Sequence, residues 1–359
     1  MNKRTKKRLR KLILTIIFIG INVAVIIATA VNEFSGGSDA TDLMEVKLDG
    51  WMLIPATLCF VGMIVLEYAK YVLMILKSSK PGAFAYREVW KLAWRIVMIG
   101  RYYDKVTPAA IGGQPAQILQ MRKTGKISAG MATAIPVFSM IAGQITFILI
   151  AIPCFIFSGI GGSHPALVAT AWFGLLFYAF WPIMVVATSI SPKFTAWVIN
   201  LVVRVLARFK IVKNRNEAIA KVEEEVLSYT KNVKMIAKSP LAFGGVLLMS
   251  LVSNVLLSFI PYFVLSAFGG DIGFWESFFL TVGVEAAVYF IPTPGNSGAA
   301  EGTFYVVFSR LSSGYVFWAM MLWRFFSYYI YIIVGPCIYL AMHFEKKRKE
   351  RDDHKKQTS

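Results

Sequence analysis

The chain has little charge: charged residues make up 16% of its 359 residues, whereas hydrophobic residues make up 57%. Soluble domains average about a quarter charged residues, so an ordinary aqueous protein is disfavoured. The hydrophobic residues also gather in runs, and about 20 apolar residues cross a hydrocarbon layer about 30 Å thick. The composition therefore predicts an all-α polytopic membrane protein.

Cysteine and histidine are scarce, with three of each. Cys59, Cys154 and Cys337 all lie in apolar runs without CxxC spacing, and the histidines are scattered. This pattern disfavours both a disulfide framework and a zinc site. The chain also lacks a Walker loop, a GxGxxG motif and a recognisable nucleophile–base–acid arrangement. We therefore expect no metal, no cofactor and no catalytic residue of a familiar kind.

The net charge of +18 is concentrated in tails and loops. Seven lysines and arginines precede the apolar stretch 12–31, and an acidic loop follows that stretch. Because basic segments stay in the cytoplasm and are attracted to anionic lipid, both termini are predicted to be cytoplasmic and no nucleic-acid partner is expected. A cleaved signal peptide is the alternative for 12–31, but its apolar run is longer than the usual 7 to 15 or so residues.

Six stretches are long and apolar enough to be full spans: 12–31, 51–76, 127–156, 166–190, 241–268 and 315–342. They divide the chain into a basic tail (1–11), a first membrane half (12–190), cytoplasmic amphipathic helices (191–240), a second membrane half (241–343) and a second basic tail (344–359).

Two further apolar segments, 88–122 and 274–312, are interrupted by prolines, glycines and charged residues. A continuous helix through the first would bury three charges and break at two prolines. We therefore predict two re-entrant hairpins, whose broken backbone must be surrounded by protein or by a watery cavity. If both segments cross instead, the chain has eight spans and the termini remain cytoplasmic.

The two halves repeat one order with opposite orientation: a span, a Pro/Gly-broken hairpin and a second long span. The first unit starts with the span 51–76 and the second with the span 241–268. Inverted repeats with broken helices are typical of transporters, in which the breaks meet at the substrate site. This pattern makes the two breaks the candidate functional site.

The breaks and their charged neighbours supply the candidate binding residues. Adjacent glycines allow close backbone approach, and amides at broken helix ends can hold an anion. Arg101 fits either a bidentate phosphate contact or a surface pair with Asp104. Glu301 needs a partner in a membrane, and Arg324 is the natural one, either at a central cavity or as a lock on the fold. Glu67, Lys70 and Glu285 are weaker candidates. The predicted substrate-binding residues are Arg101, Gly112, Gly113, Gln117, Pro294, Gly295, Asn296, Glu301 and Arg324.

The two broken segments resemble the lysylphosphatidylglycerol synthase/flippase transmembrane family. The resemblance covers about residues 12–342. In that family an arginine commonly follows the glycine pair, where this chain has Gln117, so the basic group is missing there. The matching parts are Pro108 to Gly113, Arg122 to Gly125, Pro292 to Glu301, and Arg324 with Gly335.

The resemblance implies lipid handling in a bacterial plasma membrane, by translocating (flipping) an anionic or lysyl-modified phospholipid between leaflets, with effects on resistance to cationic peptides. In longer relatives this module precedes a soluble domain that transfers lysine from aminoacyl-tRNA to phosphatidylglycerol. About 17 residues follow the last span, so we expect that domain to be absent. The alternatives are a phosphatidylglycerol lysyltransferase or its membrane subunit, and a small-anion transporter. The expected partners are membrane phospholipids, and a homo-oligomer stays open.

Overall fold

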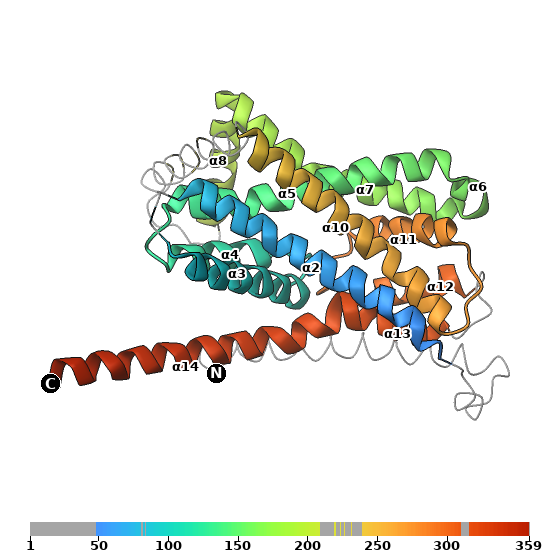
Figure 1. Cartoon of the computed structure of the whole chain (residues 1–359). Helices are drawn as coiled ribbons and strands as arrows, with labels where there is room; N and C mark the ends of the chain where they lie inside the picture. The colour runs from blue at the N-terminus through green and yellow to red at the C-terminus, as the bar shows by residue number, and fades with distance from the viewer. Residues whose placement is uncertain are drawn as a thin grey trace, which may run out of the picture. The chain divides into compact units, whose positions relative to one another are not determined.

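The computed structural model describes residues 48–79, 82, 84–208, 219, 223, 226, 231, 239–309 and 316–358. Within this part of the chain every regular element is a helix, as Figure 1 shows, which confirms the all-α fold. The helices are α2 (Gly50–Ser78), α3 (Tyr86–Val106), α4 (Gly113–Arg122), α5 (Ala129–Phe157), α6 (Ile160–Ser163), α7 (Pro165–Ile190), α8 (Pro192–Arg208), α10 (Pro240–Ala267), α11 (Phe274–Val288), α12 (Ala299–Phe308), α13 (Val316–Arg324), the π-helix η2 (Phe325–Tyr329) and α14 (Ile330–Thr358).

Five helical stretches in the described part of the chain are long and apolar enough to cross a membrane. They correspond to the second to sixth predicted spans. The first predicted span, 12–31, lies outside the described residues, as does most of the second predicted amphipathic stretch. The five stretches are Gly50–Ser78, Ala129–Phe157, Pro165–Thr188, Pro240–Ala267 and Val316–Met342, the last formed by α13, η2 and the start of α14.

The chain divides into two compact units. The first takes in Met1–Phe60, Val97–Gly113 and Ser258–Ser359, and the second takes in Val61–Ile96 and Gln114–Leu257. The turns of both breaks, 107–113 and 293–298, belong to the first unit. The contacts described below lie within one unit or the other.

The first broken segment folds back on itself. Within the second unit, the Gln117 side chain donates to the carbonyl oxygen of Ile96 at 3.3 Å, and Lys126 pairs with Glu88 at 2.7 Å. Moving away from the break along α3, from Ile96 to Glu88, the partner moves away from the break in the other direction, from Gln117 to Lys126. This pattern makes α3 and α4 an antiparallel hairpin, and its re-entrant placement in the membrane stays a prediction.

The second broken segment consists of two short helices that pack against each other. Helix α11 has 15 residues and α12 has 10, and residues 289–298 separate them. Each is shorter than the roughly 20 residues that a full span needs. Neither helix alone therefore crosses a bilayer.

Polar side chains connect the spans of the second unit. Lys70 is 1% exposed, and its ammonium lies 2.6 Å from the Glu67 carboxylate and donates to Ser250 Oγ at 3.0 Å. The Asn254 amide donates to the carbonyl oxygen of Gly143 at 3.0 Å. Hydrogen bonds between helices are a common means of association in membranes, where apolar burial gives little driving force.

Candidate functional site

The two breaks meet inside the first unit. Pro108, between α3 and α4, and Pro294, between α11 and α12, face each other in an isolated antiparallel β-bridge. The bridge sets the backbones of the two breaks side by side at these positions. The structure thus brings together two segments that the sequence places in opposite halves of the chain.

The first break is a tight turn with an unusual backbone. Ala109 has φ 55° and Ala110 has φ 51°, both in the left-handed region. The amide of Ile111 donates to the carbonyl oxygen of Pro108 at 3.4 Å, which closes the turn. Positive φ at both central residues is the pattern of a type I′ turn. Left-handed alanines are uncommon, and such strained residues cluster at functional sites.

The second break repeats this turn. Gly295 has φ 60° and Asn296 has φ 55°, and the amide of Ser297 donates to the carbonyl oxygen of Pro294 at 3.2 Å. In both breaks the turn follows a Thr-Pro pair, Thr107 and Pro108 in one and Thr293 and Pro294 in the other. The shared turn geometry supports the inverted repeat independently of the order of the spans.

The backbone amides at the restarted helices are already hydrogen-bonded to the chain itself. The amide of Gly112 donates to Thr107 Oγ1 at 2.9 Å, and that of Gly113 donates to Asp104 Oδ1 at 3.0 Å. The amide of Gly298 donates to the Glu301 carboxylate at 2.7 Å. Side-chain oxygens of the chain thus occupy these three amides, and anion binding at the breaks stays a prediction.

The predicted contact between Glu301 and Arg324 is present. Arg324 Nε donates to Glu301 Oε1 at 2.7 Å, and Glu301 is 1% and Arg324 3% exposed. Arg324 Nη2 also donates to Ser297 Oγ at 2.9 Å and to the carbonyl oxygen of Gly295 at 3.4 Å. The pair thus ties span six to the turn and to the helix after it, which is what a lock on the break requires.

Tyr328 completes this arrangement. The Arg324 guanidinium lies over its ring at 4.5 Å, and a side chain added at Gly295 would collide with the same ring. The residues 325–329 form a π-helix directly after Arg324. Short π-helices are rare in proteins overall, but those that occur are found frequently at functional sites. Trp323 Nε1 and Ser327 Oγ, beside Arg324, are buried without a hydrogen-bond partner among the described residues.

Lys105 and Glu285 add two charges that the predicted binding set did not include. Each lies in the last turn of the helix that precedes a break, Lys105 in α3 and Glu285 in α11. Both are partly exposed, unlike Glu301 and Arg324. The carbonyl oxygen of Lys105 also faces Gly295. A charge inside an apolar segment is the sequence signal that marks them.

Most of the predicted residues belong to the first unit: Arg101, Gly112, Gly113, Pro294, Gly295, Asn296, Glu301 and Arg324. Gln117 belongs to the second unit. It is buried there, accepting from the Tyr71 hydroxyl at 2.9 Å as well as donating to Ile96. Substrate contact by these residues stays a prediction. In the described part of the chain, no cluster of histidine, cysteine, aspartate and glutamate could hold a metal ion.

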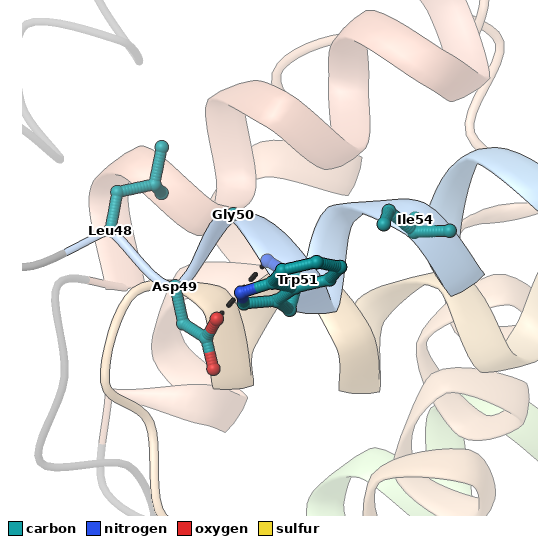
Figure 2. Close-up of a pocket in the computed structure, with 5 residues that line it drawn as sticks. All are labelled: Leu48, Asp49, Gly50, Trp51 and Ile54. Atoms are coloured by element: carbon teal, nitrogen blue, oxygen red, sulfur yellow. Dashed lines mark hydrogen bonds between the residues drawn. The ribbon is translucent and has the colours of Figure 1, made fainter.

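A separate hollow lies at the start of α2 (Figure 2). The residues that line it are Leu48, Asp49, Gly50, Trp51 and Ile54, with the Trp51 amide donating to Asp49 Oδ1 at 3.1 Å. It is wide open and holds none of the residues of the two breaks. Exposed tryptophan at the end of a span is typical of a membrane interface.

The fold defines an all-α polytopic membrane protein in which the turns of two broken segments pair. The chain belongs to the lysylphosphatidylglycerol synthase transmembrane family: its residues 12–335 match the model described as "Lysylphosphatidylglycerol synthase TM region". Membership of this family indicates a function related to membrane lipid. No curated protein and no solved structure matches it.

Proposed function

We propose that the protein translocates a phospholipid between the leaflets of a bacterial plasma membrane, with its headgroup passing the paired breaks of the first unit. The observation that carries this proposal is the meeting of Pro108 and Pro294 in a charged region of a membrane protein. Broken helices at membrane depth are tolerated only where protein or a watery cavity surrounds them, and in transporters they mark the substrate site.

The charge of the region suits a lipid headgroup. Arg101 and Lys105 lie on the α3 side of the first break, and Glu285 lies on the α11 side of the second. Both basic side chains could contact a phosphate, Arg101 by two hydrogen bonds and Lys105 as a compact charge. The acyl chains would remain in the bilayer while the headgroup crosses. Both termini would face the cytoplasm.

Glu301 and Arg324 have a supporting role in this translocation. They are buried and hydrogen-bonded to each other, so they hold the second turn in the shape that meets Pro108. Only the rearrangement of that turn would expose them to a substrate. This is a narrower role than direct headgroup binding by every predicted residue.

Leaflet exchange in liposomes tests the proposal. The purified protein would be reconstituted, and the accessibility of labelled phosphatidylglycerol, lysylphosphatidylglycerol and phosphatidylethanolamine to a membrane-impermeant quencher would be followed. We expect exchange faster than in protein-free liposomes and slowed by Gly295→Val, which obstructs the turn. Exchange equal to that of protein-free liposomes for every lipid would refute translocation.

Two parallel measurements address the other candidate activities. New lipid species in extracts of expressing cells would support a lysyltransferase or its membrane subunit. Uptake of a water-soluble anion without leaflet exchange would support an anion transporter.

A further inference from the structure

Helix α8 begins where a membrane span ends. The span of α7 runs to Thr188, and Ser191, which has an extended backbone, ends that helix. The Thr195 hydroxyl in the first turn of α8 donates to the carbonyl oxygen of Thr188 at 2.6 Å. The Phe194 amide donates to Ser191 Oγ at 3.2 Å, which caps the new helix. The start of α8 is therefore held at the boundary between hydrocarbon and water.

The charge of α8 disfavours a path back through the membrane. The helix has 17 residues, with Lys193 in its first turn and Arg204 near its end. Both side chains are exposed. Charged side chains are costly in hydrocarbon, so the helix is most stable along the boundary, where both charges reach water or lipid headgroups.

Two faces of α8 differ in burial. Ile199 and Val203, one turn apart, are 4% and 0% exposed. This face packs on the protein. Another face carries four exposed residues at spacings of four, four and three, which places them on one stripe of the helix. The exposed stripe of α8 consists of Lys193, Trp197, Leu201 and Arg204.

The exposed stripe combines apolar and basic side chains. Trp197 is 58% and Leu201 42% exposed, and the Trp197 ring stacks on Phe194 with 5.6 Å between centroids. Helix α8 carries three basic residues and no acidic one, and in the described part of the chain neither Lys193 nor Arg204 forms a salt bridge. Tryptophan favours the headgroup level of a membrane, and lysine and arginine lay their stems along apolar surface while their charges reach phosphate.

We propose that the exposed stripe of α8 is a docking surface for anionic phospholipid of the surrounding bilayer. Trp197 and Leu201 lie among the upper parts of the acyl chains, and Lys193 and Arg204 bind lipid phosphates. The occupant is bilayer lipid, because the apolar residues between the two bases need an apolar environment. The surface belongs to the second unit, whereas the paired turns belong to the first, so this inference goes beyond the proposed translocation and does not depend on it.

Quenching of a fluorophore on the stripe by brominated lipid tests the proposal. The full chain would carry Leu201→Cys as its single cysteine, labelled and reconstituted in liposomes of phosphatidylcholine and phosphatidylglycerol, with bromine on the acyl chains of one lipid or the other. We expect phosphatidylglycerol to be preferred about fivefold, the contribution of one base at an anionic surface. The control is Leu248→Cys, exposed on α10, a helix without basic residues, where the two lipids should quench equally.

Charge variants assign the preference to the two bases. Lys193→Gln combined with Arg204→Gln should bring the ratio of the two lipids to about one, while brominated phosphatidylcholine still quenches because the apolar contact remains. Lys126→Gln, which removes an exposed base elsewhere in the second unit, should leave the ratio unchanged. A preference for phosphatidylglycerol that survives the double variant would overturn the assignment.

A salt titration gives a second readout that needs no charge variant to fold. At 1 M salt the screening length falls to about 3 Å, so the preference at Leu201 should disappear while quenching by brominated phosphatidylcholine persists. Equal quenching by the two lipids at low salt would overturn the inference. Absence of quenching by either lipid would also overturn it, because protein would then cover the stripe.

Discussion

Pro108 and Pro294 pair across an antiparallel bridge, so the turns that interrupt the two broken segments contact each other directly. The two turns share their left-handed central residues and their closing hydrogen bonds. A change in the shape of one turn should therefore alter the position of the other, because the two are in direct contact. This relationship makes the turns the most sensitive place at which to test the proposed function.

Replacing Gly295 should disable the second turn. Its φ of 60° disfavours any side chain, and a Cβ there would meet the Tyr328 ring. We expect Gly295→Ala to destabilise the protein by about 1 to 3 kcal/mol and to slow lipid exchange. Thermal unfolding in detergent and the liposome assay would measure both effects. Gly302→Ala is the control, because a Cβ at that helical glycine meets nothing within 4 Å; equal losses for both variants would contradict the prediction.

Removing one member of the buried ion pair should cost more than removing both. Arg324→Met leaves the Glu301 carboxylate buried without its cation, at a cost of about 3 to 5 kcal/mol. The double variant with Glu301→Gln should recover part of that loss, as thermal unfolding of the full double-mutant cycle would show. Arg324→Lys should fail to restore the wild type, because a lysine lacks the planar fork that serves Glu301 and Ser297 together. Additive single effects would argue against the lock.

The buried Lys70–Glu67 pair should contribute more to the free energy of unfolding than the exposed Lys126–Glu88 pair. Lys70→Met leaves Glu67 without its cation inside a span and should destabilise by about 3 kcal/mol or more. Lys126→Met removes one member of an exposed pair, for which about 0 to 1 kcal/mol is expected. Parallel thermal denaturation of the two variants measures the difference. Similar shifts would mean that the Lys70 charge is not paired in the membrane.

Chemical labelling distinguishes six spans from eight. Because Glu88 and Lys126 contact each other at the base of the first hairpin, single cysteines at these two positions should react with an impermeant reagent from the same side, the cytoplasm. The background would carry serine at Cys59, Cys154 and Cys337. Labelling of the two positions from opposite sides would show that this segment crosses the membrane.

Much of the fold followed from the sequence. Long apolar runs have one stable form in lipid, the helix, so α2, α5, α7, α10 and the helices of span six were predictable from length and composition. The breaks were predictable for a related reason, since proline removes an amide donor and obstructs the helix. Even the partner of Glu301 was predictable, because a carboxylate in an apolar segment needs a cation and Arg324 was the available one.

Only the tertiary structure decided how these parts serve a site. It pairs Pro108 with Pro294. The amides of Gly112 and Gly113 are hydrogen-bonded to the side chains of Thr107 and Asp104. Gln117 lies in the second unit, where it accepts a hydrogen bond from Tyr71. Local sequence fixes whether a segment is helical, through hydrogen bonds a few residues apart. Which side chains end up hydrogen-bonded to each other and which remain free depends on contacts between segments far apart in the chain.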